Sequence, residues 1–450
     1  MLKPFLLAAA LLPLAGCSVL DPNDVLTRGY GNAAPANGAA LDAATRAQAF
    51  DFVWQRVNDG YVDPKLRGVD WKALGQQYRP LALAAPSDEV FWDTLDRMTG
   101  ELGDAHTRVA SPRQYAYQKN KQTYTLGLRV REIDGEMVVV SVRKDSPAAK
   151  HGIAPGQVVT DIDSKPALQW WQSTLAKARK NSTPRARNSS VMRILNAGSP
   201  DAPSPNLALR LARPDGTAFD ALVERAVVPV KPAVVVKTLD SGYGYFGLSA
   251  FDRSLNGAVV RGMAALKATP GMIIDLRGNG GGSMGIASSL MSSLVSGKVG
   301  AGKSITRSGK PITAFLGLVD ISKPEYILNG RPDAYRGKVV VLIDDASASA
   351  SEMTAATLQG LGRAKVVGET SCGCLLGFLG LSNVPGGGGL AYSELDFEPV
   401  GGGRIEGKGV VPDVQVALTR ANLIAGKDAT LAAATALLDE QTGKKVATVP

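Results

Sequence analysis

A run of serines and small residues, Ser347–Glu352, combines hydroxyl nucleophiles with a backbone that can bind an anion. It follows an apolar strand predicted over Val339–Ile343 and leads into a helix predicted over Glu352–Leu361. A tight turn between a buried strand and a helix exposes a serine hydroxyl and leaves the first helical N–H groups free. One of these serines could therefore attack a carbonyl while the start of the helix holds the negative charge.

A glycine-rich loop, Gly278–Gly282, lies upstream and follows a second predicted strand, Met272–Arg277. Glycines let a backbone approach a reacting carbonyl closely and donate N–H bonds to it. We expect an oxyanion hole made of the N–H of Ala350 and one N–H from Gly280 or Gly281. Together, the serine turn and the glycine loop predict acyl-transfer chemistry.

Four motifs resemble, in their order, the superfamily of serine peptidases that contains the carboxyl-terminal processing peptidases and the tricorn protease core. They are Asp275–Gly282, Ser347–Glu352, Gly362–Thr370 and Ile405–Asp413. The resemblance implies an α/β (α+β multidomain) fold: a small N-terminal helical domain, a PDZ-like domain and a ClpP/crotonase-like α/β catalytic core. It also implies Ser349 as the nucleophile, with Ser347 and Ser351 as competitors. Ser351 could instead cap the helix.

The residue that would act as the general base is less directly indicated by the sequence. Where the processing-peptidase branch has its lysine, this chain has Cys374. The tricorn branch pairs its serine with a histidine and a glutamate, and the resemblance then implies His106 as base and Glu406 as its acidic partner. An imidazole titrates near neutral pH, as such a base should. Alternatives for the acidic partner are Glu394, Glu398 and Asp104.

Two cysteines occur in the segment where the family lysine would stand. Cys372 and Cys374 are separated by Gly373 only, so a bridge between them would close a strained ring, and we expect no disulfide. We interpret them as small residues lining the loop; a cysteine nucleophile is the alternative. With two histidines in the chain, we expect no metal site and no cofactor.

The N-terminus reads as a targeting signal. Lys3 precedes an apolar stretch, Phe5–Leu14, that is too short to span a bilayer. Leu14–Cys17 is similar to the bacterial lipobox, which implies cleavage of residues 1–17 and lipidation of Cys17. Residues 18–45 read as a flexible tether. The expected location is the cell envelope, with the protein held at the outer membrane and facing the periplasm.

Three domains are expected after the tether: a helical domain over 46–120, a PDZ-like domain over 121–230 and the catalytic core over 231–420. A C-terminal helix over 421–450 follows. The basic segment Leu168–Leu195 looks like a helical insertion in the PDZ-like domain. Leu126, Gly127 and Leu128 would stand where that fold binds the terminal carboxylate of a peptide. The partners implied are polypeptides and their C-termini.

Composition limits the function classes. The 450 residues are 45% hydrophobic and 20% charged, as in ordinary soluble globular proteins. The net charge of +9 is scattered without interleaved aromatic residues, which favours acidic substrates or anionic surfaces over nucleic acid. The sequence predicts a lipid-anchored serine endopeptidase or C-terminal processing peptidase. The alternatives are an inactive pseudopeptidase that binds peptides and a small-ester hydrolase.

Overall fold

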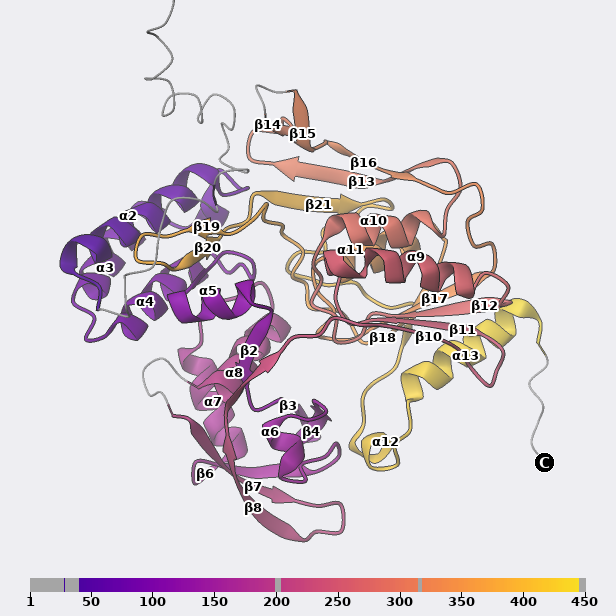
Figure 1. Ribbon diagram of the computed structural model, residues 1–450, viewed down its shortest axis with the longest axis horizontal. Coiled ribbons are helices and arrows are strands. Elements are labelled where there is room, and N and C mark those ends of the chain that lie inside the picture. Colours follow the sequence, from indigo (N-terminus) through magenta and orange to yellow (C-terminus); the bar gives the residue numbers. More distant parts are fainter. Residues whose placement is uncertain (1–27, 29–39, 199–203, 315–317, 445–450) are drawn as a thin grey trace, which may run out of the picture.

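The computed structural model describes residues 28, 40–198, 204–314 and 318–444 (Figure 1). The expected signal peptide, the lipidation of Cys17 and most of the tether therefore lie outside the described residues. Within the described ranges, no helix is both long and apolar enough to cross a membrane.

The first described region is helical and consists of α2 (Ala43–Gly60), α3 (Trp71–Leu83) and α4 (Asp88–Gly100). Each helix is capped at its N-terminus by a side chain that accepts a hydrogen bond from an N–H of the first turn. The capping residues are Asp42, Asp70 and Ser87, respectively. Their apolar faces form one core with residues from the distant segment 376–392. Strand β1 (Arg108–Ala110) strengthens this link, because it pairs with β20 (Gly389–Ala391).

An antiparallel sheet follows, with strand order β3-β4-β5-β7-β8 and β6 beside β5. Its strands are β3 (Leu128–Ile133), β4 (Glu136–Val142), β5 (Val158–Ile162), β6 (Lys165–Pro166), β7 (Asn206–Ala212) and β8 (Ala218–Glu224). The short α6 (Pro147–Lys150) precedes β5. Two helices, α7 (Ala167–Lys177) and α8 (Pro184–Ala197), stand between β6 and β7, where the sequence predicts a helical insertion. A ribbon of β2 (Gln122–Thr125) and β9 (Ala226–Pro229) brackets this region.

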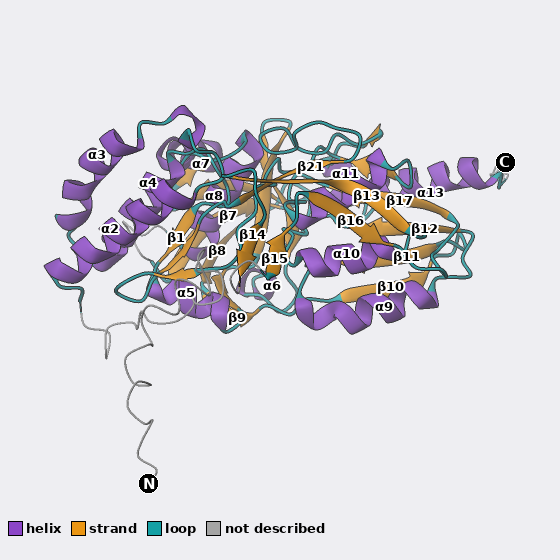
Figure 2. Cartoon of the chain, turned by 90° about the horizontal axis from the view of Figure 1, so that it is seen from above, coloured by secondary structure: helices purple, strands orange, loops and turns teal. Residues whose placement is uncertain are grey.

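The C-terminal half contains a six-stranded sheet in which only β10 is antiparallel to its neighbour. Its strands are β10 (Val234–Thr238), β11 (Gly244–Leu248), β12 (Gly271–Asp275), β17 (Lys338–Ile343), β18 (Lys365–Gly368) and β22 (Val414–Gln415). One face packs against α9 (Asn256–Ala265), α10 (Met284–Ser292) and α11 (Ala350–Gly360), and the other against α13 (Ala429–Thr442) (Figure 2). Burial on both faces explains why the central strands are continuous apolar runs.

A second, smaller sheet of β16 (Glu325–Asn329), β13 (Lys298–Thr306) and β21 (Leu395–Pro399) lies on the helical side. The other described elements are α5 (Pro112–Lys119), β14 (Ile312–Ala314), β15 (Val319–Ser322), β19 (Ser382–Asn383), α12 (Arg420–Ile424) and 3-10 helices at Leu66–Gly68 and Arg253–Leu255. The single helix expected at the C-terminus is in fact two, α12 and α13. Gly426, in the left-handed region at φ 61°, lies in the break between them.

Candidate active site

The turn that bears Ser349 lies at the carboxyl edge of the parallel sheet. Strands β12 and β17 pair in register there, so the loops that follow them are adjacent. Ser349 has φ 55° and ψ −119°, a strained conformation for a residue with a side chain, and it directly precedes α11. Its N–H is shared between the carbonyl of Cys374 and Oε2 of Glu352, each at 3.0 Å. The residue is half-buried, so the hydroxyl is reachable from outside.

The glycine loop packs tightly against this turn. A β-carbon added to Gly281, which has φ 96°, would lie 2.7 Å from Cβ of Ser349 and 2.9 Å from the nitrogen of Ala350. The N–H of Gly281 donates to Oδ1 of Asn279 at 2.9 Å. Among the described residues, the N–H groups of Gly280 and Ala350 have no such partner. These two donors are therefore the ones available to an oxyanion.

The competing serines have structural bonds. The hydroxyl of Ser347 donates to the carbonyl of Leu276, and that of Ser351 to the carbonyl of Asn279, both at 2.8 Å. Both serines are fully buried. They tie the turn to the strand end and glycine loop upstream, and the helix-capping position belongs to Ser349, not Ser351.

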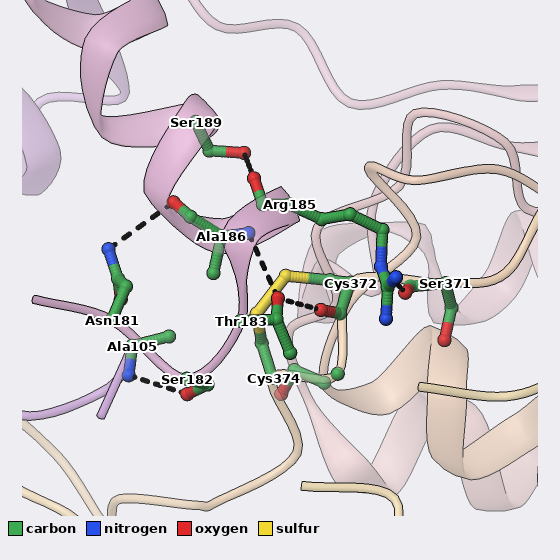
Figure 3. The surroundings of a disulfide bond; sticks show 12 residues. Ala105, Asn181, Ser182, Thr183, Arg185, Ala186, Ser189, Ser371, Cys372 and Cys374 are labelled. Carbon is green, nitrogen blue, oxygen red and sulfur yellow. Dashed lines mark hydrogen bonds between the residues drawn. A yellow bond between two sulfur atoms is a disulfide. The ribbon is translucent and has the colours of Figure 1, made fainter. Parts of the chain in front are cut away.

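The two neighbouring cysteines form a disulfide, so the expectation of none was wrong (Figure 3). Gly373 between them has φ 75°, in the left-handed region that reverses the chain, and their Cα atoms are 5.3 Å apart, within the usual range for a bridge. The loop is held from a second side by α8, because Thr183 donates to the carbonyl of Cys372 and Arg185 to that of Ser371.

Glu352 fastens this loop to the nucleophile turn, a role that the sequence analysis missed. Its buried carboxylate accepts the hydroxyl of Ser371 and the N–H of Gly373, both at 2.6 Å, and the N–H of Cys374 at 2.9 Å. Burial raises its pKa to about 7, although these hydrogen bonds oppose the shift. The Ser-x-x-Glu spacing typical of a capping box was the available signal.

His106 is presented by a segment that Asp104 organises. The carboxylate of Asp104 accepts the N–H of His106 at 2.8 Å and the hydroxyls of Thr107 and Ser393. Neither ring nitrogen of His106 has a hydrogen-bond partner in the described part of the chain, and Nδ1 is buried. Burial, with Arg108 nearby, lowers the pKa of His106 to about 4 against the opposing effect of Asp104. The imidazole is therefore neutral at physiological pH.

The structure brings Ser349 and His106 into one neighbourhood without joining them. Ala105 and Ala348, their immediate chain neighbours, both pack against the cluster that contains the disulfide. No hydrogen bond links the two side chains among the residues described. The disulfide loop is therefore a shared wall of both segments.

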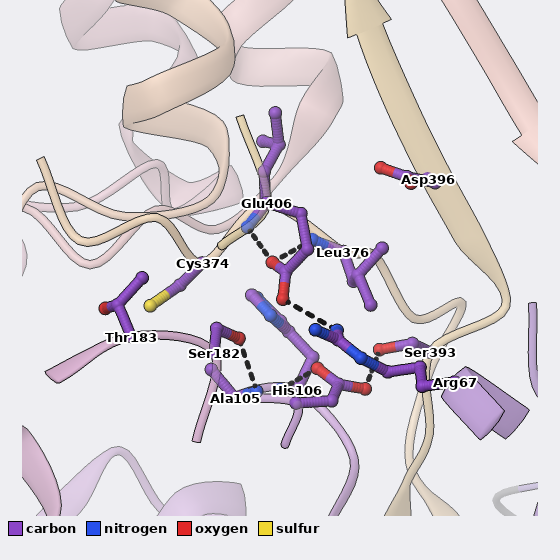
Figure 4. Close-up of polar contacts among 12 residues, drawn as sticks. Arg67, Ala105, His106, Ser182, Thr183, Cys374, Leu376, Ser393, Asp396 and Glu406 are labelled. Carbon is purple, nitrogen blue, oxygen red and sulfur yellow. Dashed lines mark hydrogen bonds and ion pairs between the residues drawn. The ribbon is translucent and has the colours of Figure 1, made fainter. Parts of the chain in front are cut away.

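Glu406 stands beside the same loop (Figure 4). Its Oε1 accepts from Nη1 of Arg67 at 3.2 Å, and its Oε2 accepts the N–H of Leu375 at 2.8 Å. Burial, then the charge of Asp104, raises its pKa. No hydrogen bond to His106 is present within the described ranges. Of the alternatives, Glu394 forms an ion pair with Arg28, while Asp104 contacts the His106 segment directly.

The loop expected to bind a peptide carboxylate contains a side chain of the protein itself. Oδ1 of Asn196, on α8, accepts the N–H groups of Gly127 and Leu128, each at 3.1 Å. Its Nδ2 donates to the carbonyl of Leu128 at 2.8 Å. Leu126 is fully buried. Helix α8 thus connects this loop, at its C-terminal end, to the disulfide loop at its start.

The families that match this chain correspond to the regions described above. Residues 242–416 match peptidase family S41, residues 42–100 match the tricorn protease C1 domain and residues 125–185 match a PDZ domain. The chloroplastic C-terminal processing peptidase of Tetradesmus obliquus is 26% identical over 81% of this chain and 75% of its own length. A tricorn protease homologue of Streptomyces coelicolor is 26% identical over 84% of the chain, which spans 31% of that larger protein.

Solved structures show the same fold. The photosystem II D1 C-terminal processing protease superposes with a TM-score of 0.54 at 21% identity, covering 86% of this chain and 98% of that one. Mature CPAF superposes with a TM-score of 0.64 at 16% identity, covering 89% and 96%. With a helical region, a PDZ domain and an α/β catalytic domain in this order, the chain contains a peptidase family S41 domain at residues 242–416 and is a serine-type peptidase.

Proposed function

We propose that the chain is a C-terminal processing endopeptidase that cleaves polypeptides through an acyl-enzyme on Ser349. One observation carries the proposal: a half-exposed serine at the start of α11 lies against a glycine loop, and two N–H groups beside it are unused. Relatives named as C-terminal processing peptidases support the choice of polypeptide substrates.

In the proposed reaction, neutral His106 accepts the proton of the Ser349 hydroxyl as the oxygen attacks the peptide carbonyl. The N–H groups of Ala350 and Gly280 bind the resulting oxyanion. His106 then protonates the leaving amine, and a water molecule repeats the sequence on the ester. The imidazolium that forms needs a carboxylate nearby, a role we assign to Glu406. The dyad requires the two segments to approach across the disulfide loop.

We further propose that the protein is a lipoprotein anchored through Cys17 in the bacterial cell envelope, at the outer membrane facing the periplasm. The lipobox-like Leu14–Cys17 carries this proposal. Mass spectrometry of the mature N-terminus should find a lipid on Cys17 and none in Cys17→Ser. An unmodified Cys17 in membrane-fractionated protein would contradict the anchor while leaving the peptidase proposal untouched.

Leu126, Gly127 and Leu128 are proposed to take part in binding substrate C-termini once Asn196 leaves their N–H groups. The support is geometric, because a carboxylate would need the two donors that Asn196 now uses.

Fluorophosphonate labelling of the full chain tests the catalytic proposal. We expect the wild type to be labelled on Ser349 and the label to be lost in Ser349→Ala and His106→Ala. The exposed His151 supplies the matched control, and His151→Ala should be labelled like wild type. Labelling that survives Ser349→Ala would identify another nucleophile. A folded wild-type protein that never reacts would favour the peptide-binding pseudopeptidase. Cleavage of short esters without any peptide cleavage would favour the ester hydrolase.

A further inference from the structure

A large cavity outside the catalytic turn separates the helical region from the PDZ domain. It has a volume of about 1090 Å³ and is lined by residues of α4, β1, α5, β2, α7 and α8. Figure 1 shows α5 and β2 next to α8 in this part of the molecule. Eight of the lining side chains are basic and four are acidic. The cavity therefore carries an excess of positive charge.

One arginine in the wall is fully engaged. Nη1 of Arg179 pairs with Oδ1 of Asp96 at 2.8 Å, and its Nη2 donates to the carbonyls of Asp104 and Thr107. The same oxygen of Asp96 also accepts the N–H of Val109 at 2.9 Å. Asp96 is thus committed to the wall and to the segment that carries His106.

The side chains of two further arginines in the wall, Arg108 on β1 and Arg193 on α8, form no hydrogen bond or ion pair within the described ranges. Burial, and then the charge of Arg193, lowers the pKa of Arg108 to about 10. Burial also lowers the pKa of Arg193, although Asp96 opposes the shift. Guanidinium groups stay charged at physiological pH, so this pair adds to the positive charge of the cavity, which the carboxylates of Asp96 and Asp93 offset only in part.

One edge of strand β2 also faces this cavity. All four residues of β2 (Gln122–Thr125) line it, and β2 pairs with β9 alone among the described strands. The aromatic side chains of Trp92, Tyr117 and Tyr124 line it as well. A free strand edge binds an extended polypeptide through main-chain hydrogen bonds, while side-chain pockets provide selectivity. Arginines give such a groove a preference for carboxylates.

We propose that this cavity is a secondary binding site for an acidic segment of a polypeptide, whose carboxylates Arg108 and Arg193 bind. The identity of that polypeptide as the substrate rests on the proposed peptidase function. The site adjoins the PDZ carboxylate loop, because Asn196, whose side chain occupies that loop, also lines the cavity.

Peptide binding to the full chain bearing Ser349→Ala tests the site without turnover. The probe is a fluorescent extended peptide with several Glu residues, and its partner has Gln at each of those positions. We expect the Glu peptide to bind at least about tenfold more tightly, and Arg193→Glu to remove that advantage. Lys150→Glu makes the same change in net charge on an exposed residue outside the cavity and should leave the affinity unchanged.

Other results of these binding experiments would overturn the proposed site or reassign it. Equal affinity for the Glu and Gln peptides, or equal losses in Arg193→Glu and Lys150→Glu, would overturn the site. Displacement of the Glu peptide by a single-stranded oligonucleotide at lower concentration would assign the cavity to nucleic acid instead. Fluorophosphonate labelling of Arg193→Glu on an unsubstituted Ser349 should proceed at the wild-type rate. If the wild type is not labelled yet the peptide binds as expected, the peptidase proposal fails and the acidic-peptide site stands.

Discussion

Two glycine turns in the described part of the chain differ in whether their N–H groups are free to bind an anion. At the catalytic turn, the N–H groups of Gly280 and Ala350 have no partner among the described residues. At the PDZ loop, those of Gly127 and Leu128 both donate to the Asn196 side chain. Gly281 and Gly127 both have positive φ, at 96° and 79°. The backbone conformation of the two turns is similar, and the residues packed beside them differ.

The comparison teaches that a turn's chemistry gives it the capacity to bind an anion, while the packing around it decides whether that capacity is free. At the catalytic turn, Glu352 accepts the N–H groups of Gly373 and Cys374 and so fixes the disulfide loop beside Ser349. At the PDZ loop, α8 delivers an amide oxygen to the donors themselves. The two turns are therefore in opposite states in one structure.

The largest expected effect comes from closing the open turn. A methyl group at Gly281 would meet Ser349 and Ala350 below 3 Å, so Gly281→Ala should lower kcat by about 10²- to 10³-fold, as loss of an oxyanion donor does. Steady-state cleavage of a peptide substrate measures it. Gly285→Ala, where the nearest atom is at 3.6 Å, is the control. A loss of less than tenfold would show that the glycine loop does not form the oxyanion site.

Removing the charge of Glu352 should change how stability depends on pH. Its pKa in the folded protein, about 7, lies above its ordinary 4.5. A carboxyl with a raised pKa contributes stability that is fully present below its unfolded pKa of 4.5 and is lost as the pH rises through its folded pKa of about 7. The loss of unfolding free energy is on the order of 3 kcal/mol. Urea unfolding at pH 5 and pH 8 should show a larger loss of stability in wild type than in Glu352→Gln. The exposed Glu398→Gln should behave like wild type, and a pH dependence as large in Glu352→Gln as in wild type would contradict the assignment.

Emptying the filled turn is the reciprocal test. Asn196→Ala removes the acceptor of the buried Leu128 N–H, while the Gly127 N–H keeps the Thr125 hydroxyl at 2.9 Å, and should cost about 1–3 kcal/mol of unfolding free energy. We also expect the variant to bind a peptide with a free C-terminal carboxylate and not its amide, measured by calorimetry. Asn188→Ala, at an exposed position of the same helix, should do neither. Tight binding of both peptides by wild type would show that the loop is already open.

The smallest effect concerns His106. Its pKa of about 4 lies below the ordinary 6.5, so the base remains neutral as the pH falls to about 5. The kcat/KM of the free enzyme should therefore change by less than about twofold between pH 5.5 and 7 and fall as the pH approaches 4. An acid limb centred near 6.5 would show that His106 is exposed to water in the active form.

Much of the catalytic core follows from local sequence. The strand predicted over Val339–Ile343 matches β17 (Lys338–Ile343) to within one residue, because a buried parallel strand is a short continuous apolar run. The turn at Ser347–Glu352 was placed between a strand and a helix for the same reason. The disulfide was missed because its formation depends on the φ of Gly373, which the sequence leaves open.

What the sequence by itself determined is the list of groups: a serine before a helix, a glycine loop beside it, a histidine in a polar segment and a cationic chain. Only the tertiary structure decided which groups meet. Asn196 reaches Leu128 across 68 positions, and Arg108 and Arg193 face one cavity from different regions. Local patterns reflect backbone sterics and burial, which act over a few residues. The partner of a hydrogen-bond donor or a charge is set by distances that exist only after the regions have packed together.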